Sequence, residues 1–283
     1  MGIVQALFPP GLFTSSFMQN AWLAGTAVAV LSALIGFFVV LRGASFAAHA
    51  VPRASFAGAA GAVLVGGDTL LGLAIFSALS AFGIASLASR RDQGQTTALV
   101  LMAALGLGSL FLTLGGAYAP EVYALLFGQI VGISRVDVYA ILGLLFLALL
   151  ATALLYRPLL WSSVAPDVAE AKGVSRRRME TLFLLLVALA ATAAVPVVGA
   201  LLSFSLMVGP AAAAAYFGRS PLQALAIAVL IGVLSIWFSL IFAYDTGLPV
   251  GFFVAAVTAI FYGLGRLWAW LWQIERSIGP EAA

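Results

Sequence analysis

The sequence predicts an all-α membrane protein, a polytopic bundle of about eight or nine transmembrane helices. Of its 283 residues, 64% are hydrophobic and 8% are charged, whereas a soluble domain carries about 25% charged residues. The apolar residues fall into stretches of roughly 20, the length of a helix that crosses a bilayer. A soluble protein of this size could not bury so much apolar surface, whereas a bilayer solvates apolar side chains on the outside of a membrane protein.

Nine apolar stretches, give or take one, are predicted to cross the membrane. Together they form a transmembrane domain over residues 17–272, preceded by a surface lead-in (1–16) and followed by a short cytoplasmic tail (273–283). A further stretch, 119–134, is apolar but short, which favours a re-entrant or interfacial segment between two spans. The predicted spans are 17–41, 45–66, 69–88, 96–116, 136–156, 180–195, 197–217, 221–243 and 249–272.

The basic residues indicate the orientation of the bundle. With the N-terminus outside and the C-terminus inside, 11 of the 13 lysines and arginines lie at inner helix ends or in inner loops, where membrane proteins carry an excess of positive charge. Arg135 then lies outside and Arg53 lies within a span. The same bias accounts for the net charge of +3 without a nucleic-acid partner. The eleven are Arg42, Arg90, Arg91, Arg157, Lys172, Arg176, Arg177, Arg178, Arg219, Arg266 and Arg276.

One long polar stretch, 157–180, falls on the inner side. Pro158 and Pro166 are expected to break any continuous helix there. From residue 165 to 172 the composition is helical, with Asp167 at the favourable N-terminal end of the helix dipole and Gly173 as its terminator. We expect a short cytoplasmic helix; a solvated loop is the alternative from the residues alone.

Nothing in the sequence indicates an enzyme. The chain has no Walker A sequence, no glycine-rich phosphate loop followed by lysine, and no histidine pair for zinc hydrolysis. It contains no cysteine, which excludes disulfides and thiolate metal sites. Gly199, Gly209 and Pro210 share one apolar stretch, which is typical of a broken helix lining a transport cavity and equally of close helix packing.

The candidate site is a polar stripe in the second span, formed by Ser45, His49 and Arg53. His49 is the one histidine of the sequence, and residues four apart share a helix face. A charged side chain within the bilayer costs at least ~2.5 kcal/mol, so such groups usually face a bundle interior or a wet cavity. Two alternatives remain: His49 is a packing residue, and Arg53 snorkels to the inner headgroups.

Five short stretches, in this order and spacing, resemble the ABC-3 family of permeases, the membrane subunits of bacterial zinc, manganese and iron importers. The resemblance extends from about Phe17 to Trp272. The stretches are Phe37–Arg42 with Ala44–Phe46, Leu126–Ile130 with Gly132–Ser134, the set Asp167, Ala171 and Gly173, Val198–Leu202 with Pro210–Ala212, and Leu248–Gly251.

This resemblance implies a transport permease in the bacterial inner membrane, working as a homodimer or pseudo-dimer. Its partners would be two cytoplasmic ATPase subunits, which consume the ATP, and an external metal-binding lipoprotein. The permease itself would hold no bound cofactor. The helix at 165–173 would be the coupling helix that docks into the ATPase through Asp167, Ala171 and Gly173.

The chain departs from the family at the metal pathway. The family usually places an Asp and a His four residues apart in the second span as pore metal ligands, and the resemblance puts His49 and Arg53 there. Neutral imidazole ligates metals, whereas a guanidinium is always protonated and repels a bare cation. Gly247 stands where the family often has Asp.

Two explanations of this departure are open. The preferred one is a divalent-metal permease whose gate carries Arg53 as a barrier; the other is a permease for a metal chelate or an anionic substrate. Two more distant alternatives are a non-transport membrane scaffold and an ion-driven secondary transporter. The lack of acidic residues in mid-membrane positions argues against proton coupling.

Overall fold

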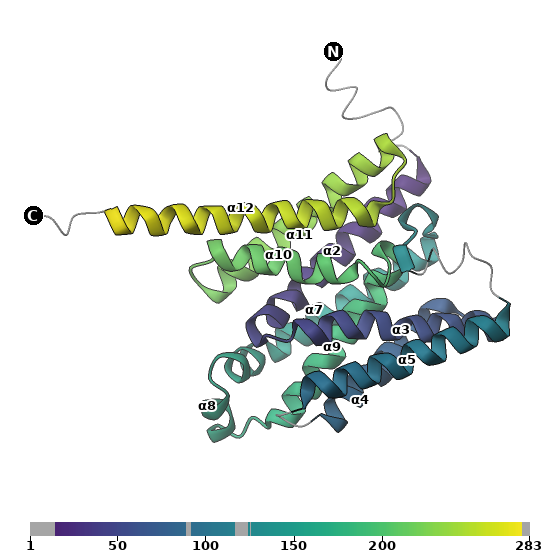
Figure 1. Ribbon diagram of the computed structural model, residues 1–283, viewed down its shortest axis with the longest axis horizontal. Coiled ribbons are helices and arrows are strands. Elements are labelled where there is room, and N and C mark those ends of the chain that lie inside the picture. The colour runs from purple at the N-terminus through teal and green to yellow at the C-terminus, as the bar shows by residue number, and fades with distance from the viewer. Residues whose placement is uncertain (1–14, 89–91, 117–123, 125, 279–283) are drawn as a thin grey trace, which may run out of the picture.

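The computed structural model describes residues 15–88, 92–116, 124 and 126–278. Over these residues the protein is helical, without strands, and successive long helices cross the molecule in opposite directions (Figure 1). The long helices are α2 (Ser16–Arg42), α3 (Ser45–Val65), α4 (Thr69–Leu87), α5 (Gln93–Gly115), α7 (Arg135–Val164), α9 (Arg176–Val198), α10 (Ser203–Phe217), α11 (Pro221–Thr246) and α12 (Val250–Ile278). Residues 1–14 of the predicted lead-in (1–16) and residues 279–283 of the predicted tail (273–283) lie outside the described residues.

Each of the nine predicted spans corresponds to one of these helices. Seven of them are long and apolar enough to cross a bilayer by length and composition: α2, α4, α5, α7, α9, α11 and α12. Helix α3 is not in that set, because His49 and Arg53 lower its hydropathy. Helix α10 has 15 residues, about 22 Å at 1.5 Å per residue, which is short of the ~30 Å hydrocarbon core.

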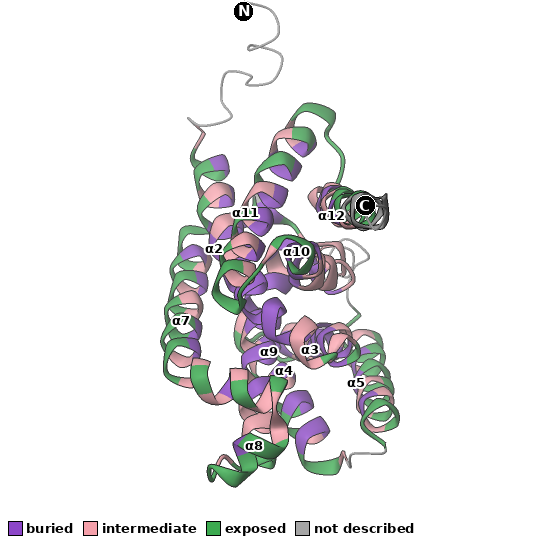
Figure 2. Cartoon of the chain, turned by 90° about the vertical axis from the view of Figure 1, so that its left-hand side faces the viewer, coloured by how far each residue is buried: buried purple, intermediate pink, exposed green. Residues whose placement is uncertain are grey.

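Helices α2 and α9 form the centre of the bundle. In their most apolar windows, 78% and 72% of the residues are buried, against 11% in α5 and 22% in α7. Figure 2 shows the same division, with exposed residues concentrated on the peripheral helices α5 and α7. The multi-pass architecture therefore has a buried interior around α2 and α9, and peripheral helices whose apolar side chains are exposed.

Small residues let the central helices touch through their backbones. A Cβ atom on Gly36 of α2 would overlap the Met207 carbonyl oxygen of α10, and one on Gly58 of α3 would overlap the carbonyl of Gly72 in α4. Such close approach is the usual role of small residues in membrane bundles. It brings α10 against the central helix α2, and α3 against α4; α3 and α10 carry the candidate site.

Helical structure is interrupted at Gly199, between α9 and α10, whereas α10 continues through Gly209 and Pro210. A second irregular segment packs into this break. Gly199, which follows α9, has φ +89°, and Gly128 has φ +79°. The Gln129 backbone N–H donates to the Pro196 carbonyl at 3.2 Å, and the Leu201 N–H donates to the Leu126 carbonyl at 3.1 Å. Backbone without regular structure is tolerated at membrane depth where protein buries it.

Three of the stretches that carry the family resemblance converge at this break. Besides Leu126–Ile130 and Val198–Leu202, the first turn of α12 contributes Gly251, where a Cβ would lie 2.5 Å from the Leu202 side chain. The described part of the predicted segment 119–134 is therefore packed into the protein. Its short 3₁₀ turn η1 (Ile130–Gly132) contacts α2 and α9.

The short helix predicted within 165–173 is present as α8 (Pro166–Ala171), so the loop alternative is wrong. Asp167 lies in its first turn, and Gly173 follows with φ +81°. The prediction that Pro158 interrupts the chain is also wrong, because α7 continues through it to Val164. A proline removes one backbone donor, and the hydrogen bonds on either side are sufficient to continue α7 for six more residues.

Candidate functional site

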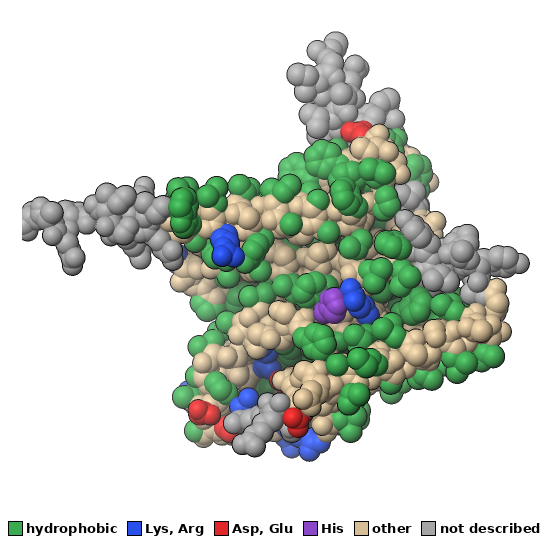
Figure 3. Space-filling view, viewed as in Figure 1, with side chains coloured by type: hydrophobic (Ala, Val, Ile, Leu, Met, Phe, Trp, Pro, Cys, Tyr) green, Lys and Arg blue, Asp and Glu red, His purple; other side chains and the backbone are tan. Residues whose placement is uncertain are grey.

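The polar stripe of α3 lies on an open face of the molecule. Ser45 is the first residue of α3, and His49 and Arg53 follow one and two turns later. All three are half-buried, whereas Ala48 and Pro52 beside them are buried in the bundle. Figure 3 shows the single histidine in purple, with a basic side chain next to it, in the middle of the exposed face. The shared face predicted from the helical period is therefore present.

His49 is held from one side by an aromatic ring. Its imidazole meets the ring of Phe204 in α10 edge to face, with centroids 5.1 Å apart and an interplanar angle of 87°. This geometry is favourable between π systems and fixes the plane of the imidazole. No hydrogen bond joins the ring nitrogens to another residue in the described ranges, so they are free to take a ligand.

Arg53 carries a charge that nothing in the described chain neutralises. Its Nε atom is buried and has no hydrogen-bond partner, and the one ion pair found among the described residues lies elsewhere, between Arg42 and Glu180. A buried donor left unsatisfied loses its hydration without compensation. The stripe thus combines one imidazole, one hydroxyl and one unpaired guanidinium.

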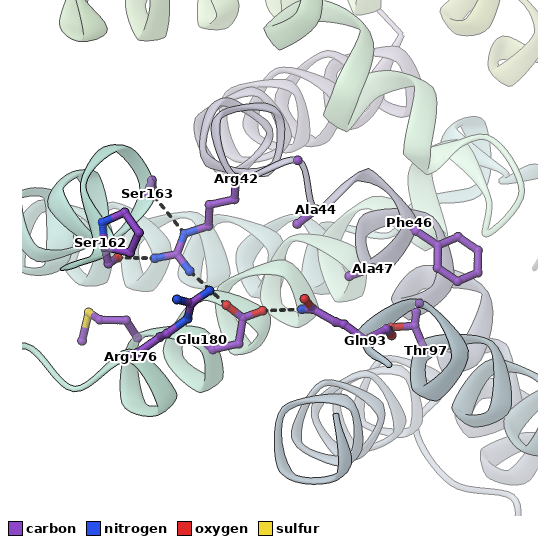
Figure 4. Close-up of a pocket in the computed structure, with 14 residues that line it drawn as sticks. Arg42, Ala44, Phe46, Ala47, Gln93, Thr97, Ser162, Ser163, Arg176 and Glu180 are labelled. Carbon is purple, nitrogen blue, oxygen red and sulfur yellow. Dashed lines mark hydrogen bonds and ion pairs between the residues drawn. The ribbon is translucent and has the colours of Figure 1, made fainter. Parts of the chain in front are cut away.

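A second polar group, here called the Arg42 cluster, lies where α2 ends. It consists of Arg42, Gln93, Ser162, Ser163 and Glu180, drawn in Figure 4. Arg42 pairs with the Glu180 carboxylate at 3.2 Å through Nη1, and donates from Nε to the Ser163 hydroxyl at 3.0 Å and from Nη2 to the Ser162 hydroxyl. Gln93 Nε2 donates to the other Glu180 oxygen at 2.7 Å.

The Arg42 cluster fastens four helices, α2, α5, α7 and α9, at one end of the bundle. The guanidinium carbon also lies 4.7 Å from the centre of the Phe183 ring, so an ion pair, two hydroxyls and an aromatic face all stabilise the charge of Arg42. A pocket of about 330 Å³ opens beside the cluster, between the start of α3 at Ala44 and Phe46 and the start of α8 at Pro166. The pocket therefore connects the cluster with the starts of α3 and α8.

Helix α8 stands apart from the stripe and presents its polar face outward. Ala169 is buried and anchors it, while Asp167 and Ala171 are exposed. The turn after it is closed by the Gly173 N–H, which donates to the Glu170 carbonyl at 2.9 Å. The Lys172 ammonium lies 4.0 Å from the centre of the Trp161 ring of α7. These contacts fix the position and direction of α8 at the end of the bundle.

Sequence reasoning placed Ser45, His49 and Arg53 together and α8 separately, but missed the Arg42 cluster. From the sequence, Arg42 is one of the positive charges at inner helix ends. The signal that could have found the pair is Glu180, an acidic side chain at the edge of a long apolar helix, because such a carboxylate needs a basic partner.

Comparison with known proteins identifies the family. The profile of the ABC 3 transport family matches residues 14–268. The chain belongs to this family. The manganese transport system membrane protein MntC of Halalkalibacterium halodurans is 30% identical to this ABC-3 protein over 84% of each chain. The manganese import system permease protein ScaB of Streptococcus parasanguinis is 26% identical over 90% of this chain and 91% of its own length.

A solved structure shares the fold of this ABC-3 protein. PsaBC from Streptococcus pneumoniae, in complex with a Fab, aligns with a TM-score of 0.81 and 24% identity over 90% of this chain and 92% of the other. The resemblance stated from the five short stretches is confirmed, and the chain is a multi-pass membrane protein of a transport family.

Proposed function

We propose that this chain is the membrane-spanning subunit of an ATP-driven importer of divalent transition metals, with manganese as the first candidate. The observation that carries the proposal is the family match over residues 14–268, joined to relatives whose names specify manganese transport. Zinc and iron are the competing metals. The match to a transport family also argues against the scaffold alternative.

The proposed assembly contains a second permease copy, two cytoplasmic ATPase subunits and an external metal-binding protein. Support for the ATPase contact comes from α8, which is anchored by buried Ala169 and presents Asp167 and Ala171 outward. Support for a second copy comes from the open stripe, because a pathway needs walls on all sides.

The proposed orientation places α8 and the C-terminus in the cytoplasm and the N-terminus outside. Arg135 begins α7 and α8 follows its other end, so the two lie on opposite sides of the bundle. The start of α2 lies at the end away from α8 in Figure 1. Lys172 and Arg176 share the α8 end, which is the side that the positive-inside rule assigns to the cytoplasm.

The test is metal uptake by proteoliposomes that contain the permease with its ATPase and binding protein. We expect ATP-dependent accumulation of radioactive manganese, and none with a non-hydrolysable ATP analogue. An excess of unlabelled zinc or iron identifies the preferred metal by competition. Accumulation that does not depend on ATP but depends on an ion gradient would indicate a secondary transporter instead. If none of the three metals accumulates, the proposal of a metal importer is wrong.

A further inference from the structure

The unpaired guanidinium of Arg53 is the feature that the proposed function leaves unexplained. Its Nε is buried without a partner, on a helix that otherwise packs apolar faces against α4 and α5. A permanent charge in such a position is normally matched by an opposite charge. Among the described helices that contact α3, α2 and α10 carry no acidic residue, and Asp68 and Asp92 lie at the N-terminal ends of α4 and α5. The acidic residue of α9, Glu180, pairs with Arg42.

A bare divalent cation is the wrong counterpart for this stripe. One imidazole and one hydroxyl supply at most two ligands, while divalent transition metals take four or more. Arg53 lies one turn from His49 and repels a cation held there. Pairing with a second copy doubles both the imidazoles and the positive charges, so the balance of charge does not improve.

An oxyanion bound to the metal resolves both problems. A guanidinium presents a planar fork of donors that fits a carboxylate or phosphate, and such a group supplies the opposite charge that Arg53 lacks in the described chain. The same oxyanion brings ligand oxygens that complete the metal's coordination next to the imidazole. Since Phe204 fixes the ring plane of His49, the two groups offer an imidazole and a fork of donors to one bound complex.

We infer that the substrate crosses this stripe as a metal–oxyanion complex, with His49 ligating the metal and Arg53 binding the oxyanion. The inference rests on the proposed function, because it specifies the form in which the metal travels. It corresponds to the second explanation considered for the sequence, a chelate or anionic substrate. It makes Arg53 a specificity-determining residue for the species that enters.

The experiment measures radioactive manganese uptake by proteoliposomes with the complete transporter, in a bicarbonate-free sulfonate buffer. One arm adds labelled citrate, one adds labelled phosphate and one adds neither. The wild type is compared with Arg53→Gln and Arg53→Lys. Arg157→Gln, which removes an exposed arginine of α7, is the matched control. The amount of assembled complex in each preparation normalises the rates.

We expect citrate or phosphate to raise wild-type manganese uptake about tenfold, the value of a charged hydrogen bond, with the labelled anion accumulating alongside the metal. Arg53→Gln loses this stimulation, Arg53→Lys keeps part of it, and Arg157→Gln behaves as wild type. A snorkelling Arg53 predicts instead that no variant changes the response to either anion.

The two proposals fail in different ways. If manganese uptake by the wild type and by Arg53→Gln is as fast without citrate or phosphate as with them, the oxyanion inference is overturned. The proposal of a metal importer then still holds. Stimulation that persists unchanged in Arg53→Gln also overturns it, because the anion then acts elsewhere. Absence of ATP-dependent metal uptake in every arm overturns the proposed function and the inference with it.

Discussion

Arg42 and Arg53 are eleven residues apart in the chain and carry the same charge, but the surroundings of the two guanidinium groups are opposite. Arg42 makes an ion pair to Glu180, donates to two serine hydroxyls and lies over the Phe183 ring. Arg53 has a buried Nε with no partner. The fold itself supplies the partners of Arg42, whereas the partner that we infer for Arg53 is a transported ligand.

The partners of Arg42 explain why it has a structural role. They come from α7 and α9, with Gln93 of α5 attached through Glu180, so the cluster joins segments more than 80 residues apart. Arg53, by contrast, neighbours a histidine with free ring nitrogens on an open face. Substitutions at the two arginines should therefore have effects of opposite sign on stability, and only those on the stripe should change how transport depends on the substrate.

The largest effect is expected from Arg42→Leu. Removing the guanidinium leaves the Glu180 carboxylate without its ion pair, which costs roughly 3–5 kcal/mol for a fully buried pair. Because 30% of the Glu180 side chain is exposed, we expect a loss of about 2–3 kcal/mol. The measurement is the temperature at which the detergent-purified permease unfolds. The double variant Arg42→Leu, Glu180→Gln should recover part of the loss; no recovery would show that the pair is not the cause.

The next effect is on transport. His49→Ala removes the imidazole that we assign to the metal, and we expect manganese uptake at limiting metal to fall about tenfold, as losses at metal sites typically do. Phe204→Leu, which keeps His49 but removes the aromatic edge contact, should lower uptake less. If both variants lower uptake equally while the unfolding temperature also falls, His49 is a packing residue and has no direct role in the pathway.

Arg53→Leu tests whether removal of the unpaired arginine has the opposite effect on stability to Arg42→Leu. Deleting an unpaired charge should raise the stability of the permease by about 1 kcal/mol, less than the ~2.5 kcal/mol insertion cost because the side chain is half exposed. The same unfolding assay as for Arg42→Leu measures it. A clear fall in stability would mean that Arg53 has a structural partner, and the contrast between the two arginines would disappear.

The smallest expected effect comes from Ser45→Asp, at the start of the stripe. A carboxylate one turn before His49 shares its helix face and adds an anionic ligand. We expect the manganese concentration at half-maximal uptake to fall about twofold to threefold, with less dependence on added citrate. Ser45→Asn, which has nearly the same size but no charge, should not produce this change; an equal effect would rule out the charge as its cause.

The helices were predictable because a bilayer imposes length and polarity on each span, and nine apolar stretches match nine helices. Local rules also placed Ser45, His49 and Arg53 on one face and ended α8 near Gly173. The continuation of α7 through Pro158 was not predictable, since the cost of one missing donor depends on neighbouring turns. The pairing of Arg42 with Glu180, 138 residues apart, depends on how the helices pack, which one sequence does not encode locally. The roles of the stripe residues stay predictions.

The crossing of the two irregular segments at Gly128 and Gly199 has a mechanical consequence. Each segment is tied to the other by backbone hydrogen bonds, and a Cβ on Gly128 would lie 2.5 Å from the Val198 carbonyl carbon. The two irregular segments are thus packed backbone to backbone and joined by hydrogen bonds. A displacement of the 126–129 segment would therefore be transmitted through main-chain hydrogen bonds to the start of α10, where Phe204 contacts His49.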